Sequence, residues 1–175
     1  MTTSLVVTAV GPDRPGLVSL LAETGQRFGA SWSGSRMASL AGQFAGMLHF
    51  QVDDAQADAL AAALRALEAK GLHVVVATSR NEGDSPPRRS AHLELVGHDR
   101  PGIVRELSQA LARLGVNIDE LDTHVASAAM SGEQLFKVKA RLSVPDGVAP
   151  DALREALEAL ANEMMIDVEI DGRAG

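Results

Sequence analysis

Several residue types that carry chemistry in other proteins are absent or scarce in this chain of 175 residues. It has no cysteine, which excludes disulfides, thiolate zinc sites and cysteine nucleophiles, and which is compatible with a reducing cytoplasm. Aromatic residues make up only 3% of the chain, so its core must be built from aliphatic side chains and methionine.

A surplus of basic residues is also missing, because the net charge is −7. Nucleic-acid binding needs a basic surface and stacking faces, so this composition argues against it. No run approaches the roughly 18 apolar residues of a membrane span, and residues 1–4 lack the basic region of a signal peptide. We therefore expect a cytoplasmic protein that contacts neither nucleic acid nor a membrane.

One short motif occurs twice. Residues 11–18 read Gly-Pro-Asp-Arg-Pro-Gly-Leu-Val, and residues 97–104 read Gly-His-Asp-Arg-Pro-Gly-Ile-Val, 86 positions later. Each copy follows a short apolar run and precedes apolar residues at helical spacing. The repeat predicts two units of similar fold.

Hydrophobic periodicity gives both units the same order of elements. In the first unit we expect strands and helices at residues 5–10, 17–28, 31–39, 44–52, 54–70 and 72–78, with a cap at Asp53-Asp54. In the second we expect them at residues 91–96, 101–114, 116–126, 136–144, 150–160 and 164–170, with a turn at Ser131-Gly132.

This order is β-α-β-β-α-β, in which the first and third strands lie centrally and both helices cover one face. The predicted fold class is α+β: two ferredoxin-like domains with antiparallel four-stranded sheets. We place the domains at residues 1–80 and 91–175. Residues 81–90 contain Pro86-Pro87 and Arg88-Arg89, and we expect them to form an extended linker with a solvated basic pair.

The repeated motif can form a helix start that accepts an anion. Pro101 tolerates the first helical position, so we expect the helix to begin there. Gly102 lacks a side chain, which would let a carboxylate approach the unpaired amides of Gly102, Ile103 and Val104. Asp99 could cap the helix or face the ammonium group of a ligand.

In the first unit the same roles fall to Asp13, Gly16, Leu17 and Val18. The strand after the helix starts with Asn117 in the second unit and with Ser31 in the first, so an Asn contact can exist only in the second. Because Asn117 should lie at the end of its unit opposite Asp99, such a contact predicts a site between units. We also expect Trp32, the sole Trp, to pack between units.

Helix capping alone is the simpler explanation of the motif. However, capping would accept Ser, Thr or Asn in place of Asp and does not require Arg. Gly near a helix start also costs up to about 1 kcal/mol relative to Ala. Duplication by descent accounts for part of the match, and we expect that at least one copy also binds a ligand.

Two β-α-β-β-α-β units with Asp-Arg-Pro-Gly-[Leu/Ile]-Val at the first strand-to-helix turn resemble ACT domains, and residues 114–118 (Leu-Gly-Val-Asn-Ile) are similar to the family's helix-to-strand passage. The tandem resembles the glycine cleavage system transcriptional repressor group. The resemblance implies a non-catalytic regulatory protein that binds a small amino acid such as glycine at domain interfaces. It also implies a protein partner, a transcription activator, and a homodimer, although an eight-stranded sheet could form within one chain or between two.

The resemblance assigns ligand binding to Asn117 on the next strand and to the positions that match the family turn. These positions are Asp13, Gly16, Leu17, Val18, Asp99, Gly102, Ile103 and Val104. Ser31 makes the first unit the less certain site. No cofactor or metal is expected.

Three other functions compete with this one. The five histidines form no metal-ligand pair and no nucleophile–base constellation is evident, which disfavours an enzyme. RNA-recognition domains share the topology but need exposed aromatics on their central strands. A ligand-independent interaction module built from two ACT-like domains is the main alternative.

Overall fold

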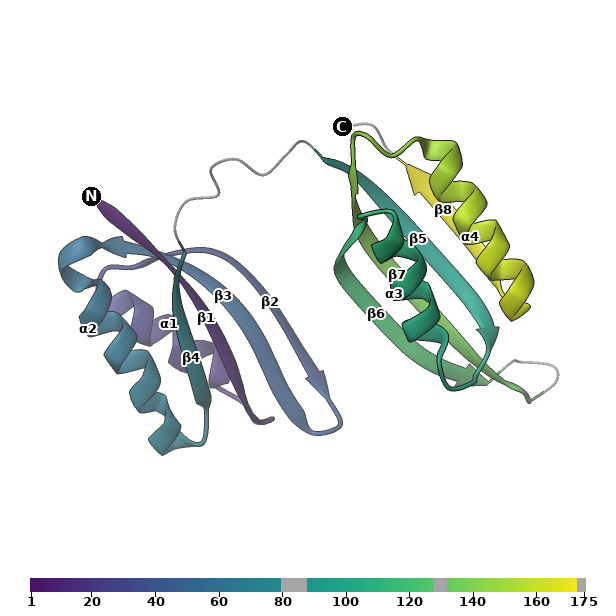
Figure 1. Ribbon diagram of the computed structural model, residues 1–175. Helices are drawn as coiled ribbons and strands as arrows, with labels where there is room; N and C mark the ends of the chain where they lie inside the picture. The colour runs from purple at the N-terminus through teal and green to yellow at the C-terminus, as the bar shows by residue number, and fades with distance from the viewer. Residues whose placement is uncertain (80–87, 128–131, 173–175) are drawn as a thin grey trace. The chain divides into compact units, whose positions relative to one another are not determined.

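The computed structural model describes residues 1–79, 88–127 and 132–172. The chain divides into two compact units, unit 1 up to residue 84 and unit 2 from residue 85. Each unit has four strands and two α-helices (Figure 1).

In unit 1 the last helix tightens into a 3-10 turn, η1, before the final strand. Its elements are β1 (Thr2–Pro12), α1 (Leu17–Arg27), β2 (Ser31–Leu40), β3 (Gln43–Asp53), α2 (Asp54–Arg65), η1 (Ala66–Lys70) and β4 (His73–Ser79). Those of unit 2 are β5 (Arg88–His98), α3 (Ile103–Arg113), β6 (Asn117–Ser127), β7 (Gln134–Pro145), α4 (Pro150–Met164) and β8 (Asp167–Gly172).

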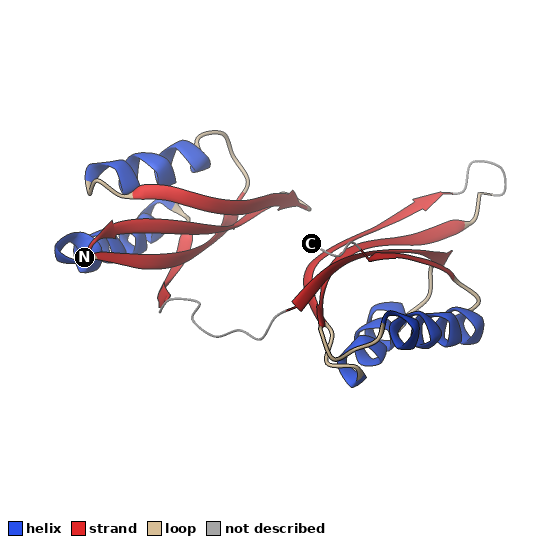
Figure 2. Ribbon diagram, turned by 90° about the horizontal axis from the view of Figure 1, so that it is seen from above, coloured by secondary structure: helices blue, strands red, loops and turns tan. Residues whose placement is uncertain are grey.

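The two sheets have the same strand order, β2-β3-β1-β4 in unit 1 and β6-β7-β5-β8 in unit 2. Every neighbouring pair is antiparallel, and the first and third strands of each unit are central. Figure 2 shows both helices of each unit on one face of its sheet. The predicted α+β class and ferredoxin-like topology are therefore confirmed.

Some predicted boundaries differ from the structure. Met164 ends α4 instead of opening the last strand, because the αL residue Met165 turns the chain after it. Residues 81–87 of the expected linker and Ser131 of the expected turn lie outside the described residues. Arg88 to Ser90, which we placed in the linker, are the first residues of β5, and Arg89 donates to the carbonyl of Val148 at 2.5 Å.

The two units fill the space between the first helix and the sheet with different residues. In α1, Gly25 is buried, and a Cβ at this position would lie 2.5 Å from Cε1 of Phe50. Trp32 of β2 packs edge-on against Phe50, with ring centroids 5.3 Å apart. The structure thus gives Trp32 a partner inside its own unit, where we expected a role between units.

Unit 2 has Leu111 at the helix position that Gly25 occupies in unit 1, by the offset of the repeated motif. Leu142 takes the strand position of Phe50, because it pairs with Ile118 as Phe50 pairs with Trp32. Leu111 and Leu142 are both buried. Unit 1 therefore fills the layer between its first helix and its sheet with one small and one large residue, and unit 2 fills it with two residues of medium size.

Candidate functional site

The two copies of the repeated motif form the same turn. Gly16 has φ of +92° and ψ of −1°, and Gly102 has φ of +101° and ψ of −11°. With Pro in the preceding position, this is the geometry of a type II turn, whose third residue needs a positive φ. Each helix starts one residue after the glycine, at Leu17 and at Ile103.

This turn corrects the prediction that the helix begins at Pro101. Gly102 and Gly16 are required because their backbones are left-handed, a conformation that costs other residues roughly 1–2 kcal/mol. The cost of Gly relative to Ala in a helix, which we took as support for a ligand, therefore does not apply here. Gly102 precedes the helix and contributes no helical amide.

The next residue of the motif in each unit is part of the core. Leu17 is 3% exposed and Ile103 is 2% exposed, so their side chains face the sheet. Only their backbone amides can contribute to a site on the surface. These amides lack intrahelical partners, and neither helix has a side-chain cap at its N-cap residue.

Val18 and Val104 are exposed, although each follows directly on a buried residue of the same apolar pair. The exposed fraction of the Val18 side chain is 48%, and that of Val104 is 37%. Both units therefore present an apolar side chain to solvent in the first turn of the first helix. An exposed valine beside open amides is suited to contact the apolar part of a small ligand.

The aspartates differ between the two turns. The backbone N–H of each aspartate donates a hydrogen bond to a carbonyl of the hairpin that follows the helix. Asp13 donates to Gly42 at 2.9 Å, and Asp99 donates to Gln134 at 3.0 Å. The Asp13 carboxylate accepts a hydrogen bond from Ser39 Oγ at 2.5 Å. Among the described residues, none donates a hydrogen bond to the Asp99 carboxylate.

The arginines of the motif have structural partners. Arg14 donates to the carbonyl of Lys70, at the end of η1, at 2.6 Å. Arg100 lies 3.4 Å from the carboxylate of Glu106 in the first turn of α3. The presence of Arg in both copies, which capping does not explain, therefore has a structural reason that differs between the units.

The first glycine of the motif is also structural. A Cβ on Gly11 would lie 2.4 Å from the carbonyl oxygen of Gly71, and a Cβ on Gly97 would lie 2.3 Å from Cγ2 of Ile166. In both units, the connection between the second helix and the last strand passes directly over this glycine. Close packing thus explains a part of the repeat that contributes nothing to a ligand site.

Asn117 lies at the end of unit 2 opposite the turn. It pairs with Ser143 across β6 and β7, and Ser143 pairs with Ser90 at the start of β5. β5 ends at His98, eight residues after Ser90, which corresponds to about 27 Å at 3.4 Å per residue. Asp99 directly follows this far end of β5. Within unit 2 the structure therefore separates Asn117 from Asp99, as the topology predicted.

A polar cluster surrounds Asn117 that the sequence analysis did not identify. Asp119 is the extra residue of a β-bulge in β6, and it accepts hydrogen bonds from Asn117 at 2.8 Å and Ser143 at 2.6 Å. Arg141 lies 3.2 Å from the Asp119 carboxylate. Burial raises the pKa of Asp119, but these hydrogen bonds and the positive charges of Arg141 and Arg88 outweigh it and lower the pKa below its ordinary 3.8.

The cluster has no counterpart at the matching bulge of unit 1, where Ser31 and Ser33 take the places of Asn117 and Asp119. A sequence signal did exist, because Asn117, Asp119 and Glu120 are three polar residues clustered at the start of the strand. Their strand partners, however, are more than twenty residues away in the chain. We interpret the cluster as a structural feature of β6 and β7.

The described parts of the chain contain no group of three or more residues able to hold a metal ion. Among the helices of residues 1–79, 88–127 and 132–172, none is long and apolar enough to span a membrane.

Comparison with known proteins identifies the family. Sequence profiles described as ACT domain match residues 3–77 and residues 91–162. No curated protein sequence matches the chain.

Two solved structures match the chain over its whole length. One, a protein of unknown function from Galdieria sulphuraria, has a TM-score of 0.88 and 28% identity over 99% of this chain and 100% of its own. The other has been assigned only provisionally as a glycine cleavage system transcriptional repressor, and has a TM-score of 0.72 and 18% identity over 100% of this chain and 99% of its own. The chain thus belongs to the ACT-domain family and carries two ACT domains in tandem.

Proposed function

We propose that this protein is a non-catalytic regulator that binds a small amino acid and thereby modulates a protein partner. Two ACT domains account for most of its length, and no catalytic family is matched. The provisional name of one full-length structural neighbour supports transcriptional control of the glycine cleavage system as the specific role. We propose a transcription activator as the partner and the cytoplasm as the location.

One observation carries the ligand-binding proposal: in unit 2, the Asp99 carboxylate has no hydrogen-bond donor among the described residues and precedes the open start of α3. A zwitterion can satisfy both groups. Its carboxylate would accept hydrogen bonds from the amides of Ile103 and Val104, at the positive end of the helix dipole. Its ammonium would pair with Asp99, and a short side chain would lie against Val104.

The energy required is modest. Millimolar affinity, which suits an abundant metabolite, corresponds to about −4 kcal/mol. A charge-assisted hydrogen bond contributes roughly 1.5–3 kcal/mol, so an ammonium on Asp99 and a carboxylate on the amides are sufficient. A small ligand such as glycine satisfies these contacts without needing a deep pocket.

The proposal is tested by thermal unfolding of the whole chain in millimolar concentrations of each common amino acid. We expect at least one small amino acid to raise the unfolding temperature, and Asp99→Ala to abolish that rise. The matched control is Asp151→Ala, which removes an acidic residue from the first turn of α4 in the same unit. A rise that persists in Asp99→Ala would contradict the role of Asp99.

Unit 1 provides the internal comparison. Because Ser39 already donates to Asp13, we expect Asp13→Ala to reduce the ligand-induced rise less than Asp99→Ala does. An equal loss in both variants would show that the units bind equally. Gly16, Leu17 and Val18 remain proposed contacts of the weaker site.

We also propose that the protein is a homodimer in which Asn117 of one copy serves the ligand turn of the other. Asn117 cannot reach Asp99 of its own unit, so this role requires a second copy. Light scattering should give twice the mass of one chain, and Asn117→Ala should weaken ligand binding while leaving that mass unchanged. A monomer, or unchanged binding, would remove Asn117 from the site.

The alternative is a ligand-independent interaction module. It is favoured by the structural roles of Arg14, Arg100, Gly11 and Gly97, which account for much of the motif without a ligand. No rise in unfolding temperature with any amino acid would support this alternative.

A further inference from the structure

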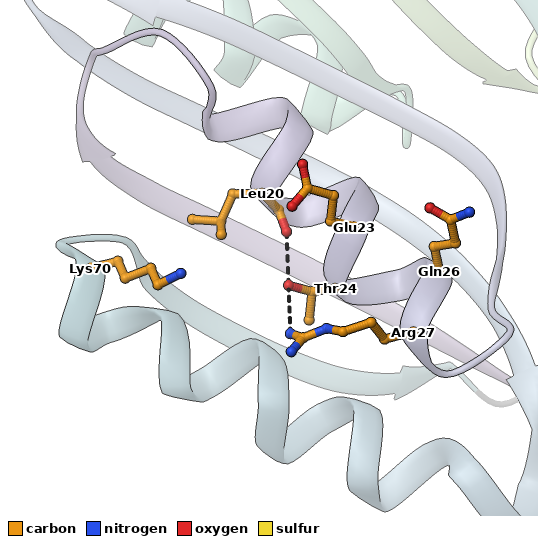
Figure 3. Close-up of a pocket in the computed structure, with 6 residues that line it drawn as sticks. All are labelled: Leu20, Glu23, Thr24, Gln26, Arg27 and Lys70. Atoms are coloured by element: carbon orange, nitrogen blue, oxygen red, sulfur yellow. Dashed lines mark hydrogen bonds between the residues drawn. The ribbon is translucent and has the colours of Figure 1, made fainter.

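A groove in unit 1 lies between α1 and the end of η1, apart from the ligand turn. It encloses about 390 Å³, and its lining combines charged, polar and apolar side chains: Leu20, Glu23, Thr24, Gln26, Arg27 and Lys70. Pockets for small molecules typically measure about 300–1,000 Å³, so the groove can hold a compact metabolite. Figure 3 shows Lys70 reaching from η1 toward Leu20, and Arg27 lying along the groove beside Thr24.

Contacts inside unit 1 fix the frame of the groove. Arg14 donates to the carbonyl of Lys70 at 2.6 Å, which holds the end of η1 near the start of α1. Thr24 is 1% exposed, donates to the carbonyl of Leu20 at 2.7 Å and accepts from Arg27 at 3.4 Å. The guanidinium of Arg27 is therefore directed into the groove.

The charges of the groove contrast with those of the chain. Arg27 and Lys70 outnumber Glu23 in a protein whose net charge is −7. Glu23 lies four residues before Arg27, the spacing of a helical ion pair, but its carboxylate accepts a hydrogen bond from Ser19 at 2.7 Å. Among the described residues, the Lys70 ammonium donates no hydrogen bond. Two cations and one carboxylate thus line the cavity, which leaves an excess of one positive charge.

Unit 2 lacks this arrangement although it has the same fold. Arg113 repeats Arg27 at the end of the first helix, but Gln109 and Ala110 stand where unit 1 has Glu23 and Thr24. In unit 2, Glu163 and Met164 precede the turn that leads into β8, so no cation takes the place of Lys70. The groove chemistry therefore arose in one unit only, and helix-end charge does not account for it.

We propose that this groove binds a small dianion, a phosphate ester or a short dicarboxylate, between Arg27 and Lys70. Opposite charge on two sides favours an anion with two charges over one with a single charge. Half-buried Leu20 provides contact for a short carbon chain. The site is separate from the proposed amino-acid site and does not depend on it.

The test uses the full chain, with inorganic phosphate and malonate as dianions, and acetate and chloride as monoanions at matched ionic strength. Binding is followed by calorimetric titration. We expect the dianions to bind at least tenfold more tightly than acetate, and Arg27→Gln and Lys70→Gln each to weaken dianion binding at least tenfold. Arg113→Gln is the matched control and should leave binding unchanged.

Three results would overturn the proposal. They are equal affinity for acetate and the dianions, phosphate binding that survives both Arg27→Gln and Lys70→Gln, and an equal loss in Arg113→Gln. Circular dichroism of each variant shows whether it is folded. Should Arg27→Gln unfold, Arg27→Lys keeps the charge at the helix end and should retain part of the binding.

Discussion

The two units pack the last turn of the first helix differently: unit 1 has buried Gly25 and unit 2 has buried Leu111. Opposite these residues the sizes are reversed, because Phe50 fills in unit 1 the place of Leu142 in unit 2. The units keep one topology while exchanging volume between helix and sheet. Residues at matching positions are therefore not interchangeable one at a time, and each unit must be treated as a coupled set.

The open sheet faces differ as well. Unit 1 exposes apolar residues on the strands of its sheet, among them Val10 at 41%, Met47 at 53% and Val75 at 54%. On β7 of unit 2, Lys137, Lys139 and Arg141 alternate with buried residues, and Lys139 pairs with Glu94 at 3.2 Å. One sequence repeat has thus produced an apolar surface in one unit and a charged surface in the other.

The largest expected effect comes from giving unit 1 the helix residue of unit 2. Gly25→Leu should lower the free energy of unfolding of unit 1 by about 3 kcal/mol, because the added side chain overlaps Phe50. This cost exceeds the roughly 1 kcal/mol that Leu gains over Gly in helix propensity. Trp32, the sole Trp, packs on Phe50, so its fluorescence in a urea titration reports on this unit.

The double variant Gly25→Leu/Phe50→Leu reproduces the pair found in unit 2 and should recover most of the lost stability. Purely additive losses in the double variant would show that the two positions are not coupled, and would break the comparison.

A smaller effect should be the same in both units. Gly16→Ala and Gly102→Ala should each lower stability by roughly 1–2 kcal/mol, because both force a side chain into left-handed backbone. The measurement is urea unfolding of the ligand-free protein. If these glycines serve only the approach of a ligand, the free protein will keep its full stability and the turn explanation fails.

Exchanging the helix-cap residues of the two units should change the stability of each by about 1 kcal/mol, in opposite directions. Asp53 caps α2 by accepting a hydrogen bond from the amide of Ala55 at 2.9 Å, while α4 begins after Ala149, which offers no cap. Asp53→Ala should destabilise unit 1 and Ala149→Asp should stabilise unit 2 by this amount. Hydrogen exchange of peptides from each unit measures both changes. No gain from Ala149→Asp would mean that the start of α4 is already satisfied.

The smallest effect is a difference in acid sensitivity. The pKa of Asp119 lies below 3.8 in the folded protein, so its contacts stabilise unit 2 fully above that value. This stability is lost as pH falls from about 4 toward the folded pKa. Asp119→Ser, which introduces the unit 1 residue of this bulge, should weaken unit 2 slightly at neutral pH and flatten its stability profile below pH 4. An unchanged acid profile would contradict the assigned pKa shift.

The sequence predicted the fold well because the strands alternate clearly. Residues 136–144 alternate apolar and polar side chains, and the structure places them in β7 with Val138, Ala140, Leu142 and Val144 buried. The repeated motif predicted the duplication, and the cap at Asp53 and the start of a helix at Pro150 lie where we expected them.

Parts of the site could not be predicted, because they depend on backbone geometry or distant partners. Two adjacent apolar residues start each helix, and periodicity alone could not show that Ile103 is buried while Val104 is exposed. The pattern Pro-Gly is compatible with a helix start and with a type II turn, and only the φ of Gly102 decides between them. Two partners of Asp119, Arg141 and Ser143, lie on β7, and Asp119 itself sits at a bulge that an alternating pattern does not reveal.

Gly11 and Gly97 lie beneath the connection to the last strand of each unit, where a methyl group would not fit. The motif in which they occur is therefore a marker of architecture as well as of chemistry. Another chain that contains Gly-x-Asp-Arg-Pro-Gly can be expected to fold in this way, whether or not it binds anything at the turn. To recognise a sensor among such chains, one should look at the residues that face the aspartate and not at the glycines that precede it.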